Sequence, residues 1–258
     1  MSVYFVGAGP GDPELLTLKG LRLIKSADVI IYAGSLIPEA LLDFAKTDAA
    51  IYNSAELDLN QIIQLIEKAY TNQLLIVRLH SGDPSIYGAI GEQIRQLEQK
   101  AIPYEIVPGV TAASAAAAIL GKEFTLSGVS QSVIFTRYHG KTPMPERERL
   151  AALAQHGTTL VIHLSTARIH QVMDDVRPFY GADCPVAVVY RASWPDEKIV
   201  LGCVDDIVIK TREQKITRTA LIIVGHVLDS KTFLDSFLYQ AEKAHIFRPK
   251  YAKQKQIN

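Results

Sequence analysis

Short apolar runs alternate along the first part of the chain with longer segments in which apolar residues recur every three or four positions. The runs predict buried strands, and the recurring spacing predicts helices with one apolar face. We expect strands at 3–6, 28–32, 74–79 and 104–107, and helices at 15–24, 38–45, 59–70, 90–97 and 111–120. Because strands that alternate with helices form parallel β-α-β units, this part predicts a doubly wound α/β sheet.

The alternation weakens over about 122–145, where apolar runs mix with glycine and proline, and then it resumes. Further helices are expected at 146–155, 167–176 and 205–212, and further strands at 160–164, 186–190, 198–203 and 219–224. We therefore expect two α/β domains, residues 1–121 and 122–240. Residues 241–258 are basic and poor in apolar positions, which predicts a mobile tail.

The composition narrows the classes of function. Lys and Arg together equal Asp and Glu at 27 each, so no excess of basic charge favours a nucleic-acid partner. The longest run of low polarity, 110–120, is shorter than the roughly 20 residues that span a bilayer. The first residues carry no export signal, which predicts a cytoplasmic protein. The only cysteines, Cys184 and Cys203, lack metal-site or redox-motif spacing and are expected to be reduced thiols.

Three loops punctuated by glycine and proline follow predicted strands, at 7–14, 80–88 and 107–113. The first resembles a dinucleotide-binding turn, but the sixth position of that motif is Asp12 instead of glycine. Asp12 before Pro13 instead predicts a helix N-cap whose carboxylate occupies the amide donors that a pyrophosphate needs. Each loop alone is typical of a simple turn. Together, without Lys or Arg, they predict a pocket for a small polar, cationic ligand bearing ribose and amino groups.

At these loops the sequence resembles the tetrapyrrole methylase family, over nearly the whole chain to about Leu228. The resemblance lies in the ordered set VGAGPGDPELLTLKG, SGDPSIYG, VPGVTAA and TRTALIIVG. Further segments are similar to the branch that methylates precorrin-4 at C-11: YAGSLI, RLHSGDPSIYGAI, TRYHGKTPMPE and YRASWPDEKIV. Sister branches tend to have glycine at the position of Ser81.

The resemblance implies a homodimer of two-domain α/β subunits, with a C-terminal mixed sheet and S-adenosylmethionine bound in a cleft between the domains. It implies C-11 methylation of precorrin-4 or cobalt-precorrin-4 in corrin biosynthesis, with S-adenosylhomocysteine as product. The positions that match family cofactor contacts are Pro10, Ser81, Gly82, Asp83, Ile86, Thr111, Ala112, Leu164, Ala192, Thr219 and Ala220. Leu164 and Ala192 are positions at which sister enzymes carry different residues.

A precorrin carries many carboxylates, so a site for it is expected to offer arginine and lysine side chains. The candidates for substrate contact are Asp12, Arg78, Tyr87, Arg137, Lys141, Arg168 and Arg191. The alternative for each charged candidate is that it forms an ordinary ion pair on the solvated surface. Trp194 is expected either to cover the flat macrocycle or to pack in the core.

No residue pattern identifies a catalytic base. Methyl transfer from a sulfonium to an electron-rich ring carbon depends mostly on the orientation of the two reactants. A methylase of this family can therefore work without a strong catalytic base. His80, His139 and His163 fit no metal-ligand spacing and are expected to be structural, with no metal bound. The alternatives are a neighbouring tetrapyrrole methylase of the corrin or sirohaem pathway, a dinucleotide-dependent oxidoreductase and a non-catalytic binding module. The sequence leaves open whether the substrate carries cobalt.

Overall fold

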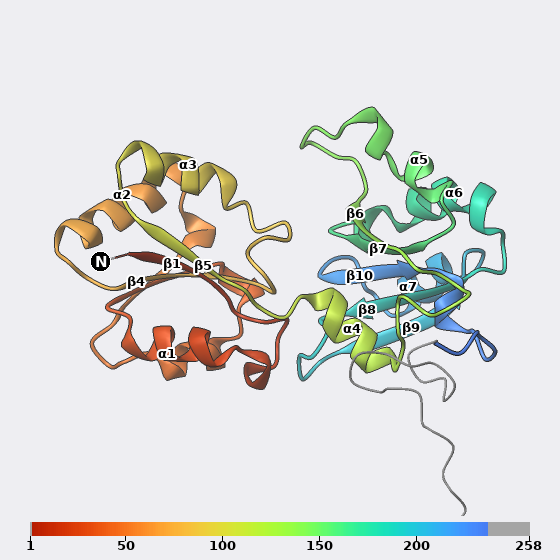
Figure 1. Ribbon diagram of the computed structural model, residues 1–258, viewed down its shortest axis with the longest axis horizontal. Helices are drawn as coiled ribbons and strands as arrows, with labels where there is room; N and C mark the ends of the chain where they lie inside the picture. Colours follow the sequence, from red (N-terminus) through yellow and green to blue (C-terminus); the bar gives the residue numbers. More distant parts are fainter. Residues whose placement is uncertain (1, 237–258) are drawn as a thin grey trace, which may run out of the picture.

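The computed structural model describes residues 2–236, which form two five-stranded sheets side by side (Figure 1). The strands of the first sheet are Val3–Gly7 (β1), Val29–Tyr32 (β2), Ala50–Asn53 (β3), Ile76–His80 (β4) and Tyr104–Val107 (β5). All are parallel, in the order β3-β2-β4-β1-β5. Their carboxyl ends therefore share one edge of the sheet, where the loops at 7–14, 80–88 and 107–113 begin.

Helices cover both faces of the first sheet. They are Leu18–Ser26 (α1), Leu59–Thr71 (α2) and Gly91–Gln99 (α3). Since successive strand residues point to opposite faces, Val3 and Phe5 pack with α2 and α3, while Val6 packs with α1. In Figure 1, α2 and α3 lie above this sheet and α1 below it. The predicted doubly wound parallel sheet is confirmed.

The second sheet is mixed. Its strands are Val133–Arg137 (β6), Thr159–His163 (β7), Pro185–Tyr190 (β8), Lys198–Cys203 (β9) and Ala220–Val224 (β10). Their order is β6-β7-β10-β8-β9, and only the β6–β7 pair is parallel. Leu150–Ala154 (α5), Ile169–Tyr180 (α6) and Ile207–Glu213 (α7) cover one face.

Helix Ala112–Leu120 (α4) joins the two sheets. It follows the last strand of the first sheet, but its alanines Ala113, Ala115 and Ala116 are buried against the second sheet, beside Val161 and Leu221. The small side chains let the helix lie close to the strands. By its packing, α4 is part of the layer that covers the second sheet. The predicted domain boundary near residue 121 stays a prediction.

Several local elements differ from the prediction. The segment 38–45 contains the 3-10 helix Glu39–Phe44, and the expected helix at 146–155 divides into the 3-10 helix Glu146–Glu148 and α5. The division lies at Arg149, whose backbone is extended with ψ at 144°. The expected helix at 15–24 likewise becomes the 3-10 helix Pro13–Leu15 followed by α1.

Asp12 is an N-cap, as predicted. Its Oδ1 accepts a hydrogen bond from the Glu14 amide at 2.8 Å, and it caps the 3-10 helix Pro13–Leu15, while Thr17 caps α1. Among residues 2–236 no helix is both long and apolar enough to cross a bilayer. The predicted tail at 241–258 lies outside the described residues.

Candidate functional site

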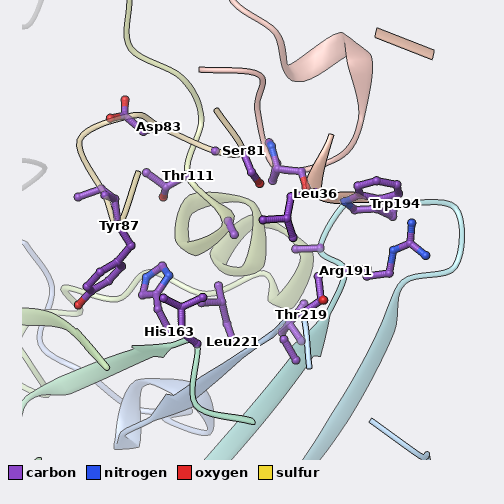
Figure 2. A pocket seen from close by; sticks show the side chains of 18 residues that line it. Leu36, Ser81, Asp83, Tyr87, Thr111, His163, Arg191, Trp194, Thr219 and Leu221 are labelled. Carbon is purple, nitrogen blue, oxygen red and sulfur yellow. Dashed lines mark hydrogen bonds between the residues drawn. The ribbon is translucent and has the colours of Figure 1, made fainter. Parts of the chain in front are cut away.

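A cleft opens between the two sheets where their loops meet (Figure 2). Every residue matched to a family cofactor contact lines it: Pro10, Ser81, Gly82, Asp83, Ile86, Thr111, Ala112, Leu164, Ala192, Thr219 and Ala220. The structure thus brings together positions from both halves of the chain. Lining residues for which the sequence analysis expected no ligand contact are Leu36, His163, Val189 and Leu221. Trp194, expected either to cover the macrocycle or to pack in the core, also lines the cleft.

The three loops of the first sheet pack backbone against backbone. Gly9 and Gly82 form an antiparallel bridge, with the Gly82 amide donating to the Gly9 carbonyl at 2.8 Å. A Cβ on Gly7 would lie 2.6 Å from backbone atoms of Gly109 and 2.7 Å from the Gly82 carbonyl oxygen. Glycine is therefore required because the loops approach more closely than any side chain allows.

Asp83 fastens the second loop to the third. Its Oδ2 accepts a hydrogen bond from the Gly109 amide at 2.8 Å, and its Oδ1 accepts bonds from the Ser85 amide and hydroxyl. Burial alone would raise the pKa of Asp83, but the hydrogen bonds from Ser85 and Gly109 outweigh it and lower the pKa. The carboxylate is thus ionised and held in place, and it gives this side of the cleft a negative charge.

The second sheet contributes three adjacent strand ends because of its topology. Strand β10 runs antiparallel to β7 and β8, so its first residues lie beside the last residues of those two strands. Ala220 pairs with Tyr190, and the Arg191 amide donates to the Thr219 carbonyl at 3.0 Å. Segments separated by many residues therefore reach one wall of the cleft.

The backbone is unusual along that wall. Leu164, Arg191, Ser193 and Thr219 have φ values of 54°, 46°, 67° and 54°, in the left-handed region that non-glycine residues seldom adopt. Such conformations cost free energy and concentrate at binding sites. The turn at Leu164 leaves its side chain 77% exposed, at the lining of the cleft.

A contact between the sheets closes one end of the cleft. The Trp194 indole Nε1 donates to the Pro10 carbonyl at 2.8 Å, and the Asp12 amide donates to the Ser193 hydroxyl at 2.9 Å. A Cβ on Gly11 would lie 2.2 Å from the Trp194 ring, so this glycine makes room for the indole. We call these contacts between residues 10–12 and 193–194 the interdomain latch.

Arg191 lies over the Trp194 ring, with its guanidinium carbon 3.9 Å from the ring centroid. Its Nη1 also donates to Asp196 at 2.7 Å. It is the only lysine or arginine lining the cleft among the described residues, and its charge is already paired. The cleft therefore lacks the free cation that a phosphate-bearing ligand would recruit, and with Asp83 it suits a cation.

His163 and Tyr87 lie at the other end of the cleft from Trp194 (Figure 2). Their ring centroids are 5.1 Å apart, and Phe135 approaches His163 at 5.8 Å. Burial lowers the pKa of His163 to about 4, so the imidazole is neutral at neutral pH. Its Nε2 is buried and has no hydrogen-bond partner among residues 2–236.

Only some of the predicted substrate contacts line a cavity in the structure. Tyr87 and Arg191 line the cleft, and Arg137 lines a second cavity with Tyr87. Lys141 is exposed and lines neither, and Asp12 lies beside the cleft in the interdomain latch.

Arg78 does not fit its predicted role. Its side chain is buried, and it donates to the Ile31 and Leu79 carbonyls and to Gln93. Burial lowers its pKa to about 10. The residue lies on strand β4 inside the first sheet, where a strand position cannot reach a ligand at the strand ends. Arg168 donates to the His139 carbonyl and lines neither cavity.

No group of three or more His, Cys, Asp or Glu side chains within residues 2–236 could hold a metal ion. Cys184 is buried and Cys203 is partly buried, and both are free thiols.

Known proteins resemble this chain over almost its full length. The family sequence model of the tetrapyrrole (corrin/porphyrin) methylases matches residues 2–208. A precorrin-4 C(11)-methyltransferase of Pseudomonas aeruginosa is 55% identical, over 96% of this chain and 99% of that protein. A solved cobalt precorrin-4 methyltransferase of cobalamin biosynthesis superposes with a TM-score of 0.87 and 41% identity, covering 89% of this chain and 96% of that one. A uroporphyrin-III C-methyltransferase from Thermus thermophilus, solved with S-adenosylhomocysteine, superposes with a TM-score of 0.74 and 30% identity, covering 88% and 99%.

Proposed function

Because this chain belongs to the tetrapyrrole (corrin/porphyrin) methylase family, we propose that it transfers a methyl group from S-adenosylmethionine to C-11 of precorrin-4 or of its cobalt-bearing form. The chain is a methyltransferase. The observation that carries the choice of substrate is the 55% identity to a precorrin-4 C(11)-methyltransferase along nearly the whole of both chains.

The chemistry of the cleft supports the cofactor. S-adenosylmethionine supplies a methyl group on a positively charged sulfur. The ionised Asp83 and the paired Arg191 leave the lining without a free positive charge, which suits such a cation and disfavours an anionic dinucleotide. We propose that residues of loops 80–88 and 107–113 hold the cofactor from one side, and Leu164, Ala192 and Thr219 from the other.

The protein contributes mainly orientation to the reaction. Displacement at a methyl carbon requires the attacking carbon, the methyl group and the leaving sulfur to be in line. Holding two reactants so can lower a barrier by roughly 7–11 kcal/mol. The closely packed glycine loops and the strained turns at Leu164 and Thr219 line one cleft that can fix the donor in this way.

Methylation assays test the substrate. The purified full chain is incubated with methyl-labelled S-adenosylmethionine and with metal-free precorrin-4, cobalt-precorrin-4 or uroporphyrinogen III, and the labelled carbon is located by NMR. We expect a new methyl group at C-11 of one or both precorrin-4 forms. Methylation of uroporphyrinogen III alone, or at another carbon, would replace the proposed substrate with that of a sister enzyme.

Binding measurements test the cofactor separately. We expect calorimetry to detect S-adenosylhomocysteine and not a nicotinamide dinucleotide. A preference for the dinucleotide would contradict the proposal and favour an oxidoreductase. The homodimer and the cytoplasmic location stay predictions from the resemblance and the sequence.

A further inference from the structure

A second cavity of about 290 Å³ lies beside the cleft. Tyr87 lines both spaces, and Phe135 lines the second cavity while contacting His163, which lines the cleft. The Tyr87–His163 pair therefore stands where the two spaces meet. A group on His163 is in reach of a molecule that extends from one space into the other.

The imidazole of His163 lacks the contacts that a structural histidine has. Its main-chain carbonyl accepts the Ser165 hydroxyl, and its buried Nε2 has no hydrogen-bond partner among the described residues. Nδ1 is not among the buried atoms and makes no hydrogen bond there either, so it is the ring nitrogen that a ligand in the cleft can reach. Leaving a buried ring nitrogen without a partner costs free energy, and such groups often serve a ligand. The aromatic contacts with Tyr87 and Phe135 hold the ring in place without using its nitrogens.

His80 gives an internal comparison. Its Nε2 is also buried without a partner, but the side chain packs against Phe5 inside the first sheet and lines neither cavity. His163 instead sits at the end of β7, one residue before the strained turn at Leu164 that lines the cleft. Only His163 of these two combines an unpartnered nitrogen with a position on the cleft wall.

We propose that the His163 imidazole accepts a hydrogen bond from a pyrrole N–H of the methyl-accepting ring, an inference that rests on the proposed function. In the reaction an electron pair of the ring forms the bond to the methyl carbon, and the sulfur–methyl bond breaks with its pair going to sulfur. Positive charge then develops on the conjugated pyrrole nitrogen. A neutral imidazole that accepts the N–H hydrogen bond stabilises that charge as it forms. The ring then loses one proton to solvent, so the products are S-adenosylhomocysteine, the neutral methylated ring and a proton.

Neutrality of the ring is consistent with this role. An imidazolium has two N–H donors and no acceptor, so only the neutral form can accept the bond. Burial keeps His163 in that form at neutral pH. The same burial strengthens a hydrogen bond because water does not compete for it.

Two substitutions separate the hydrogen bond from the packing. His163→Phe keeps an aromatic ring between Tyr87 and Phe135 but removes both nitrogens. His163→Asn places an amide oxygen near the position of Nδ1 and restores an acceptor. His170→Phe, at an exposed position on α6 beside Asp174, is the matched control.

Each variant is measured for S-adenosylhomocysteine affinity by calorimetry and for kcat and KM with the precorrin-4 form that the wild type methylates. We expect His163→Phe to bind S-adenosylhomocysteine within about twofold of the wild type and to lose roughly a hundredfold in kcat, the range of a hydrogen bond made in the transition state. We expect His163→Asn to recover part of that loss, and His170→Phe to match the wild type.

Wild-type kcat in His163→Phe would overturn the inference and leave the proposed function standing. Equal loss in His163→Phe and His163→Asn would also overturn it, because the acceptor would then be irrelevant. A wild-type protein that binds S-adenosylhomocysteine but methylates no precorrin-4 form would overturn the proposed function, and the inference with it.

Discussion

Gly109 shows how little freedom single residues have at the site. A Cβ there would lie 2.2 Å from the Gly82 carbonyl oxygen, a backbone atom that cannot move without moving its loop. Gly91, the first residue of α3, has nothing within 4 Å of the corresponding point. Two glycines of one domain therefore predict opposite results from the same substitution.

Gly109→Ala should destabilise the protein by roughly 1–3 kcal/mol, because the loops must separate to admit the methyl group. It should also weaken S-adenosylhomocysteine binding. Gly91→Ala should raise stability by about 0.4–1 kcal/mol, since alanine restricts the unfolded chain without a clash. Urea unfolding of both variants measures the difference, and equal stabilities would show that the loops are not in close contact.

Asp83→Ala should weaken S-adenosylhomocysteine binding about tenfold or more, because it removes the hydrogen bond from Gly109 that joins the second and third loops and the bond from the Ser85 amide within the second loop. Calorimetry gives the affinity and circular dichroism checks the fold. The control is Asp58→Ala, which removes the N-cap of α2 at a residue that does not line the cleft and should lower stability without changing affinity. An unchanged affinity in Asp83→Ala would place the cofactor elsewhere.

At the scale of elements, the loop after β8 determines how the two halves meet. Trp194 reaches across to Pro10, and Ser193 accepts from the Asp12 amide, so the first glycine loop is bound to the second sheet. The loop after β8 keeps its shape through Glu197, whose carboxylate accepts from the Ser193 amide at 2.6 Å. The interdomain latch thus fixes the width of the cleft at this end.

Trp194→Phe removes the hydrogen bond to Pro10 while keeping an aromatic ring over Gly11. One lost hydrogen bond of about 1 kcal/mol should weaken S-adenosylhomocysteine binding by roughly fivefold. Hydrogen exchange should quicken in residues 8–12 in the absence of ligand. If exchange there is unchanged, the interdomain latch does not order the first loop.

The sequence predicted most elements because their patterns are local. Strands β5 and β9 match the expected bounds, since each is a short run limited by turn residues. Strand β3 was not predicted, because it is an edge strand of four residues whose central Ile51 and Tyr52 are exposed. The expected helices at 15–24 and 146–155 are interrupted at Leu16 and Arg149, where the backbone is extended. The spacing of apolar residues in the sequence does not reveal these backbone angles.

The site shows the same division between local and long-range information. The predicted cofactor positions came from the family resemblance, and the structure gathers them in one cleft. Leu36 and Leu221 have no motif and line the cleft only through the packing of distant segments. Arg78 was chosen for its charge, but its place in the middle of β4 buries it. The position of His163 near the end of a predicted strand could have indicated it, since ligands bind at the strand ends of such sheets.

The molecule as a whole carries buried histidines that make its stability sensitive to acid. Burial, with a smaller contribution from Arg78, lowers the pKa of His80 to about 3, against 6.5 for the free side chain. Between these values the unfolded chain binds a proton at this position and the folded chain does not. Stability from this residue is therefore complete above about 6.5 and falls as the pH drops toward 3.

Between pH 7.5 and 5.0 the wild type should lose about 2 kcal/mol of unfolding free energy through His80 alone. His80→Gln cannot titrate and should lack that part of the pH dependence, whereas His170→Gln, at an exposed position, should retain it. Urea unfolding at the two pH values measures the slopes. Parallel slopes for the wild type and His80→Gln would refute the assignment.

The antiparallel placement of β10 between β7 and β8 has a consequence for synthesis on the ribosome. The loop that follows β1 is made among the first residues of the chain, yet the wall that faces it contains Thr219 and Ala220. A nascent chain that has emerged only as far as β9 has its first sheet but no finished second wall. The cleft is therefore complete only late in translation, and truncation before β10 yields a protein without its finished second wall.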